Sequence, residues 1–226
     1  MEDLISKKDF SIKLSPDIQT KEHILVCGGV YSGKSELIRN MGEIYTRRKI
    51  ETELYTAFPL DGTRSFKETF ITVKDLAQVM QNYDNLLNER MTQMADAHVG
   101  FYHKAGISPK VVMINLLDEY MDSDNYRAAD IIKSAVTRIT RIGYKCGILI
   151  VVSVVRASNF AISTAIKSCI DTTICTSAFD DTSSALMFGG KDLSNLYAPA
   201  PDKGVILTTD DVTLRQFTKD DIIKYN

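Results

Sequence analysis

The stretch Gly28-Gly29-Val30-Tyr31-Ser32-Gly33-Lys34-Ser35 decides the fold of this 226-residue chain. It matches the pattern G-x-x-x-x-G-K-[ST], in which glycines let the backbone curl until successive N–H groups point at phosphate oxygens. An apolar run from His23 to Cys27 precedes it, and a helix is predicted after it, from Ser35 to Arg48. The N-terminus of that helix adds the positive end of its dipole. The stretch is therefore predicted to bind phosphate groups.

A loop of this kind takes a nucleoside triphosphate. Lys34 is placed to reach the β- and γ-phosphates, and the Ser35 hydroxyl is placed to hold Mg²⁺, so ATP and Mg²⁺ are the expected ligands. The same loop can also persist as structure, or as an anion site, without supporting hydrolysis. The residues beyond the loop must decide between these two possibilities.

Strands and helices alternate along the rest of the chain. The apolar runs Val111–Leu117 and Gly147–Val155 are typical of strands whose two faces are both covered. A long helix with an apolar stripe is predicted from Val73 to Met94. Further strands are expected at 9–14, 53–58 and 172–177, further helices at 131–142, 163–169 and 183–188, and a closing hairpin at 204–207 and 212–217. This order predicts one domain over residues 1–226: an α/β, doubly wound, mainly parallel sheet of P-loop NTPase type, with helices on both faces and a C-terminal β-hairpin.

Composition narrows the class of protein. The formal net charge is −2, with no long run of one sign, which argues against a strongly basic nucleic-acid surface. Cys27 and Cys146 lie in or beside apolar stretches and are predicted to be buried free thiols, and the three histidines have no zinc-site spacing. No stretch approaches the roughly 18 consecutive apolar residues of a membrane helix. The chain by itself is expected to be soluble.

Hydrolysis needs acidic residues beside the phosphate loop, and one pair of candidates follows the strand predicted over 111–117. An enzyme of this type uses one carboxylate for the water shell of Mg²⁺ and a second to orient the attacking water. If the strand runs over 111–117, Asp118 and Glu119 are that pair. The alternative for these two residues is a solvated first turn of a helix, where acidic residues are favoured.

A second register puts different residues in the two acidic positions. If the strand ends at Ile114, the positions fall on Asn115 and Leu116. An amide can still hydrogen-bond a metal-bound water, but it has no charge to favour a divalent ion. Leucine has no polar group at all. The loop motif alone slightly favours the first register.

The order of features resembles the FtsK/SpoIIIE branch of P-loop ATPases over nearly the whole chain. The segment 88–91 (Asn-Glu-Arg-Met) is similar to the E-R-x pattern of that branch, and 138–148 resembles its R-x-x-G-I-H approach to the fourth strand. Residues 151–157 occupy the position of the A-T-Q-R-P pattern that is usual in this family. The late segment 192–204 resembles the last ATPase module of the EssC/EccC membrane proteins of type VII secretion.

The resemblance selects the second register. It places the metal acid on Asn115, the catalytic acid on Leu116 and the glutamine near the γ-phosphate on Val155. It therefore implies a terminal module that binds ATP and Mg²⁺ weakly and hydrolyses little. The implied partners are secreted protein substrates and neighbouring ATPase modules, with no nucleic acid. The implied setting is a longer membrane-anchored chain at the cytoplasmic face of the membrane, which can form an oligomer as the full-length protein.

Three further interpretations stay open. An active motor module for secretion or DNA translocation would use Asp118 and Glu119, and three basic residues of one helix would then line a pore (Lys133, Arg138 and Arg141). The pattern favours a solvated polar face for these basic residues, opposite the apolar side of the same helix. A small-molecule kinase would need an arginine-rich lid that the late segments lack. The loop-rich region 179–203, with Leu193, Leu196 and Tyr197, is either a docking surface for a secreted protein or a cover for the end of the sheet.

Overall fold

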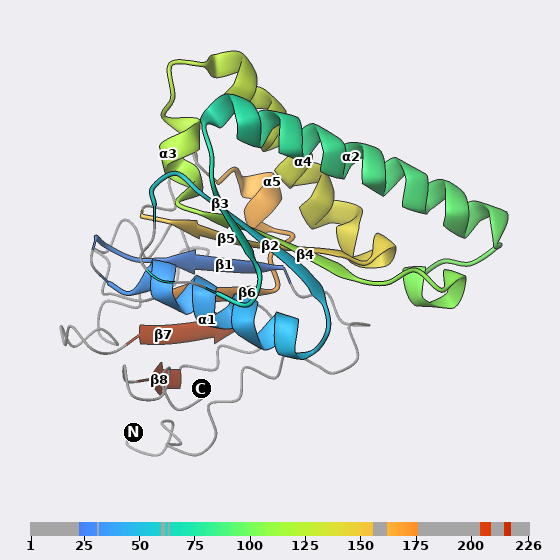
Figure 1. Ribbon diagram of the computed structural model, residues 1–226, viewed down its shortest axis with the longest axis horizontal. Helices are drawn as coiled ribbons and strands as arrows, with labels where there is room; N and C mark the ends of the chain where they lie inside the picture. Colours follow the sequence, from blue (N-terminus) through green and yellow to red (C-terminus); the bar gives the residue numbers. More distant parts are fainter. Residues whose placement is uncertain are drawn as a thin grey trace.

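The computed structural model describes residues 23–30, 32–59, 62, 64–155, 162–175, 204–208 and 215–217. One sheet runs through them in the order β3-β2-β4-β5-β1-β6-β7-β8 (Figure 1). Its strands are β1 Ile24–Cys27, β2 Glu51–Thr56, β3 Lys67–Phe70, β4 Lys110–Asn115, β5 Ile148–Val154, β6 Thr172–Cys175, β7 Gly204–Thr208 and β8 Arg215–Phe217. The strands from β3 to β6 are parallel, and β7 and β8 are antiparallel. The predicted fold class is confirmed.

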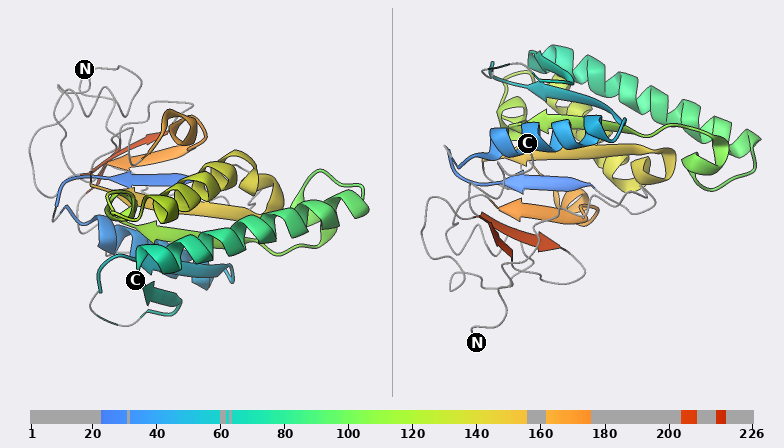
Figure 2. Two further views of the ribbon diagram at one scale, coloured as in Figure 1. Left: turned by 90° about the horizontal axis from the view of Figure 1, so that it is seen from above. Right: turned by 60° about the horizontal axis from the view of Figure 1, so that its bottom comes forward.

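Helices cover both faces of the sheet. They are α1 Lys34–Arg47, α2 Val73–Asp96, α3 Leu117–Met121, α4 Tyr126–Ile142 and α5 Thr164–Lys167, with the 3₁₀ turns η1 Tyr102–Ala105 and η2 Gly143–Cys146. Helices α2 and α4 lie side by side on one face, and α1 packs on the other (Figure 2). Of the helices in the described part of the chain, none has both the length and the apolar composition needed to cross a bilayer.

The core divides into two clusters because successive strand residues point to opposite faces. Along β4, Val112 and Ile114 face the α2–α4 layer, whereas Val111 and Met113 face α1. Every residue of β5 is buried, as the apolar run predicted. Cys27 and Cys146 are buried cysteines, as expected, and the Cys27 thiol donates to the Ile174 carbonyl.

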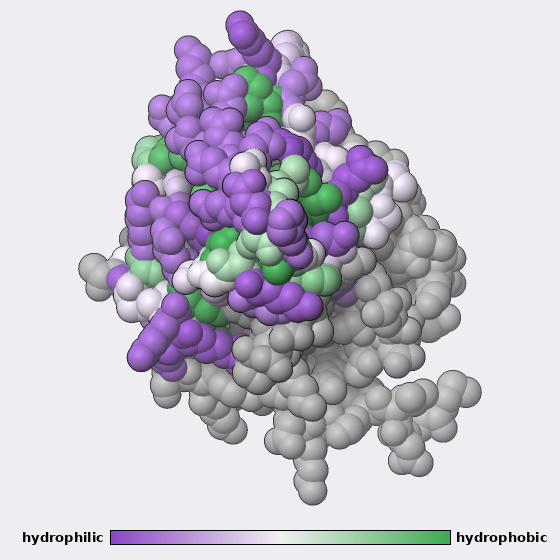
Figure 3. Space-filling view, turned by 90° about the vertical axis from the view of Figure 1, so that its right-hand side faces the viewer, coloured by the Kyte–Doolittle hydropathy of each residue, from purple (hydrophilic) through white to green (hydrophobic). Residues whose placement is uncertain are grey.

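Helix α2 begins where it was predicted, because its first turn is closed by side chains. Thr72 is the N-cap: its hydroxyl accepts from the Asp75 N–H, and the Asp75 carboxylate accepts from the Thr72 N–H. The opposite end of α2 reaches beyond the sheet together with η1. That end of the molecule is mainly hydrophilic, with smaller apolar areas between the polar side chains (Figure 3).

Several elements differ from the sequence prediction, and helix α4 begins at Tyr126 rather than at 131. The strand expected over 111–117 ends at Asn115, and Leu117 already belongs to α3, which was not predicted. Leu117 prolongs the apolar run because it is also buried, as the first residue of α3 rather than as part of the strand. Strand β3 was also missed, since Lys67-Glu68-Thr69-Phe70 is a half-exposed edge strand without an apolar run. The strand expected at 9–14 and the helical turn at 183–188 lie outside the described residues.

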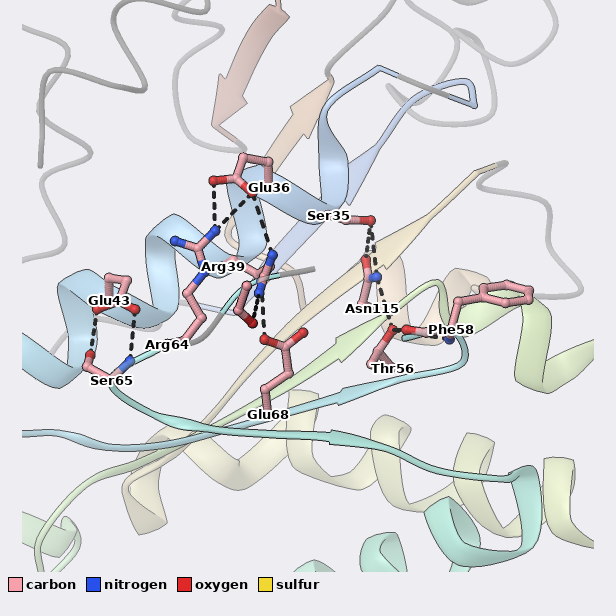
Figure 4. Close-up of polar contacts among 11 residues, drawn as sticks. Ser35, Glu36, Arg39, Glu43, Thr56, Phe58, Arg64, Ser65, Glu68 and Asn115 are labelled. Carbon is pink, nitrogen blue, oxygen red and sulfur yellow. Dashed lines mark hydrogen bonds and ion pairs between the residues drawn. The ribbon is translucent and has the colours of Figure 1, made fainter. Parts of the chain in front are cut away.

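Strand β3 and the segment before it are fastened to α1. Arg39 of α1 is buried and donates to the Glu68 carboxylate at 3.1 Å and to the Gly62 carbonyl at 3.2 Å (Figure 4). A Cβ on Gly42 would lie 2.6 Å from the ring of Phe66, so the segment crosses α1 at a position where only glycine leaves room. The helix that follows the phosphate loop is thereby tied to the edge of the sheet.

Candidate nucleotide-binding site

The loop between β1 and α1 sits at the carboxyl edge of the parallel strands, where sheets of this kind bind ligands (Figure 1). Gly33 is the N-cap of α1 and has φ 88°, a left-handed conformation that favours glycine. The Ser32 N–H donates to the Gly29 carbonyl at 3.3 Å, which curls the loop. No side chain caps α1, so the N–H groups of its first turn face the loop. Tyr31 lies outside the described residues.

Lys34 is nearly buried, with 5% of its surface exposed. Its Nζ donates to the Gly29 carbonyl at 2.6 Å, so the ammonium group lies on the backbone of the loop. Burial lowers the pKa of Lys34, and the negative charge of Asp118 opposes part of that effect. A buried ammonium on a glycine-rich loop is well placed to exchange the carbonyl for a phosphate oxygen.

Asn115, the last residue of β4, joins three parts of the site. Its amide lies within hydrogen-bond reach of Ser35 Oγ, which is 3.1 Å from Nδ2 and 3.2 Å from Oδ1 (Figure 4). Nδ2 also donates to Thr56 Oγ1 of β2 at 3.4 Å, and Oδ1 accepts from Ser153 Oγ of β5 at 2.7 Å. Asn115 is only 1% exposed. Of the sequence candidates, it is the residue that the structure brings against Ser35.

The donor set around Ser35 does not fit a magnesium ion well. Mg²⁺ prefers carboxylates and water, and the amide at this position carries no negative charge. Its N–H can also donate into the Ser35 oxygen, whose lone pairs a metal would need. The expected role of Ser35 as a metal ligand therefore has no charged partner at the end of β4.

Leu116 follows in a left-handed backbone conformation, with φ 58°, and leads into α3. Non-glycine residues adopt this region rarely, and it is held here by a hydrogen bond from the Leu116 N–H to Ser153 Oγ at 2.8 Å. Its side chain is half-buried. The position directly after the strand therefore presents an aliphatic group.

The two acidic residues of the alternative register separate in the structure. Asp118 Oδ2 accepts a hydrogen bond from the Val155 N–H at 2.7 Å, and its charge acts on Lys34. Glu119 is exposed. Asp118 thus ties α3 to the end of β5 beside the loop. The residue predicted at the glutamine position, Val155, meets Asp118 through its backbone.

Two hydroxyl residues of the site were missed by sequence reasoning. Thr56 ends β2, and its hydroxyl donates to the Phe58 carbonyl at 2.8 Å as well as accepting from Asn115. Ser153 is buried in β5 between valines. For Ser153 the available signal was a single hydroxyl near the carboxyl end of an otherwise apolar strand, which is where strand residues meet a ligand.

Part of the basic row on α4 is used for packing between helices. Arg138 donates to the Asp84 carboxylate at 2.6 Å and to the Asn88 side chain, both on α2. Arg90, in the segment that resembles the E-R-x pattern, is buried and donates to the carbonyls of Cys146 and Gly147 at 2.8 and 2.9 Å. Both arginines therefore hold α2 in place, against α4 and against the turn before β5.

Solved structures share the fold of this chain, whereas no protein-family model and no curated protein sequence matches it. The pCW3 conjugation coupling protein TcpA, solved with ATPγS, has a TM-score of 0.73 at 16% identity over 92% of this chain. EssC (ATPases 2 and 3) of Geobacillus thermodenitrificans has 0.70 at 12% identity over 92%. The chain has the fold of these proteins, as the resemblance predicted.

A third structure of this group is Thermomonospora curvata EccC (ATPases 2 and 3) in complex with a signal sequence peptide. It has a TM-score of 0.64 at 16% identity over 87% of this chain. The chain spans 66% of the length of TcpA, 42% of EssC and 37% of EccC. These identities establish the fold, and the activity has to be argued from the site.

Proposed function

We propose that the chain is a nucleotide-binding module of the FtsK/SpoIIIE type that has lost efficient hydrolysis. The observation that carries the proposal is Asn115 at the end of β4, bonded to Ser35 and followed by Leu116. The loop keeps Lys34 and the helix N-terminus that bind phosphate. Binding and hydrolysis thus separate, because they depend on different residues.

The expected loss of rate is large. Removing one well-placed electrostatic catalytic group typically costs on the order of 100- to 1,000-fold. Asn115 and Leu116 each stand where one such group is expected. Val155 has an aliphatic side chain where a polar group is expected. Turnover is therefore expected at background, while Lys34 continues to favour a bound anion.

The test is a titration with ATP, run beside a turnover assay on the same preparation. We expect weak but saturable binding that is lost in Lys34→Ala, and turnover indistinguishable from a sample without protein. Lys34→Ala also serves as the control for contaminating ATPase, because any turnover that survives it does not come from this site. Absence of saturable ATP binding by the folded wild-type chain would refute the proposal.

The biological setting is part of the same proposal. EssC and EccC contain several ATPases, and one EccC structure holds a signal sequence peptide. We propose that this chain is likewise one domain, residues 1–226, of a longer membrane-anchored secretion protein at the cytoplasmic face of the membrane. Its proposed partners are secreted protein substrates and neighbouring ATPase modules, in a full-length protein that can assemble into oligomers.

The surface proposed for the secreted substrate is the region 179–203, which lies outside the described residues. Its test is a titration with the cognate secreted protein that compares the wild type with Leu196→Asp and Tyr197→Ala. Weaker binding by stably folded variants supports this surface. Unchanged binding places the substrate site elsewhere on the chain.

One observation favours a second candidate function, an active motor module. Asp118 is bound to the end of β5 beside the loop, and its negative charge opposes the lowering of the Lys34 pKa by burial. That function predicts measurable ATP turnover that disappears in Asp118→Asn. Glu119, being exposed, is less suited to the second acidic role.

A further inference from the structure

The side chains around Asn115 bear on the form in which a nucleotide binds. Three hydroxyl groups surround its amide: Ser35 Oγ, Thr56 Oγ1 and Ser153 Oγ, at 3.1, 3.4 and 2.7 Å. The amide is buried, and both of its polar atoms have partners within the protein. The end of β4 is therefore a closed, neutral hydrogen-bonded cluster next to the phosphate loop.

The carboxylates closest in sequence to this cluster are engaged elsewhere. Glu36, directly after Ser35, accepts two hydrogen bonds from Arg64 Nη2 at 3.0 and 3.1 Å (Figure 4). Asp118 accepts from the Val155 N–H. Neither supplies the negative charge that Asn115 lacks at Ser35.

A neutral amide changes what a metal contributes to binding. In a loop with a carboxylate at this position, a triphosphate without metal meets a like charge, and the cation removes that repulsion as it binds both groups. With asparagine the end of β4 has no such repulsion to remove and no charged ligand to gain, while Asp118 keeps its hydrogen bond to the Val155 N–H. The backbone N–H groups, the helix N-terminus and Lys34 attract the polyphosphate whether or not a metal accompanies it.

We propose that this site binds the polyphosphate of a nucleotide without requiring a divalent cation. The inference rests on the proposed nucleotide-binding function. It adds that binding does not require the cation because residue 115 is the neutral Asn115. Asparagine and aspartate have the same shape, so Asn115→Asp changes the charge at the end of β4 with little change in volume. The Ser35 and Ser153 hydroxyls, which already donate to Asn115 Oδ1, can donate to the new carboxylate and favour its ionised form.

The experiment is a calorimetric titration of the 226-residue chain with ATP, once in Mg²⁺ and once in EDTA. For the wild type we expect dissociation constants that agree within about threefold. For Asn115→Asp we expect binding in EDTA to weaken by about tenfold or more, and Mg²⁺ to restore it. Asn85→Asp, which adds the same charge at an exposed position of α2, is expected to behave like the wild type.

Each outcome separates this inference from the function on which it rests. Wild-type binding that appears only with Mg²⁺ overturns metal independence and leaves nucleotide binding intact. Wild-type binding under neither condition overturns both. Equal binding in Mg²⁺ and EDTA by Asn115→Asp removes the role assigned to Asn115. If Asn115→Asp does not fold, as judged by thermal unfolding, the wild-type comparison still decides whether the site needs the metal.

Discussion

Replacing Glu53 with glutamine tests how β2, the strand that carries Thr56 to the site, is fixed in the sheet. The Glu53 carboxylate accepts from the hydroxyls of Tyr55 at 2.7 Å and Tyr83 at 2.8 Å. Lys67 and Lys110 lie 3.3 and 3.5 Å from its oxygens. One carboxylate thus joins β2 to its two neighbouring strands and to α2.

The magnitude follows from the pKa. Burial by itself raises the pKa of Glu53, but the two tyrosine hydroxyls and the lysine charges outweigh it and lower the pKa from 4.5 to about 2. A shift of that size corresponds to about 3 kcal/mol between the two protonation states. Since 14% of the side chain is exposed, solvent screening reduces this to roughly 2 kcal/mol.

The sign sets the pH window. The ionised form is favoured by the fold, so its stabilisation is fully present above the unfolded pKa of about 4.5 and is lost as pH falls toward 2. We therefore expect Glu53→Gln to lower the free energy of unfolding by roughly 2 kcal/mol at pH 7, and by less as the pH falls below about 4. Denaturant unfolding of the wild type and of Glu53→Gln, at pH 7 and again below about pH 4, measures the difference in the free energy of unfolding.

The matched control is Glu51→Gln on the same strand. Glu51 bonds to Lys110, but 65% of its side chain is exposed, so we expect a change below about 0.5 kcal/mol. If Glu53→Gln is as stable as the wild type at pH 7, or if its deficit is the same at every pH, the assigned role of this carboxylate is incorrect.

Two further predictions concern α1 and the loop. Arg39→Ala should destabilise the chain by roughly 2–4 kcal/mol in denaturant unfolding, because it leaves the half-buried Glu68 without its partner at 3.1 Å. A loss below about 0.5 kcal/mol would contradict this prediction. ATP affinity should fall as pH rises toward about 10, beginning earlier than for an ordinary lysine, because burial lowers the pKa of Lys34 and only its charged form attracts phosphate. The arginine of Lys34→Arg stays charged over this range, so the ATP affinity of that variant should not change with pH. If the ATP affinity of the wild type and of Lys34→Arg falls equally as pH rises, the titrating group is not Lys34.

The phosphate loop could be read directly from the sequence because its pattern describes a local backbone shape. Glycine at 33 is required by the left-handed φ, and the flanking strand and helix follow from local apolar patterns. The parallel sheet followed in the same way from the alternation of strands and helices. Local rules were sufficient for these features.

The end of β4 could not be placed by periodicity. Residues 111–114, 116 and 117 are all apolar, but the chain leaves the sheet after Asn115 because Leu116 adopts a left-handed conformation stabilised by Ser153, a residue 37 positions away. The family resemblance set the second register, and the strand ends one residue later than that register stated. The hydroxyls of Thr56 and Ser153 were missed since they become neighbours of Asn115 only when three strands are assembled.

The steady-state turnover of ATP by the wild-type chain tests the central claim most directly, with two variants measured beside it. The account predicts background turnover for the wild type and for Asp118→Asn, and an increase of about tenfold or more for Asn115→Asp/Leu116→Glu, which returns both carboxylates to the end of β4. A wild-type turnover near 1 per second, in the ordinary range of enzymes, that vanishes in Asp118→Asn would contradict it.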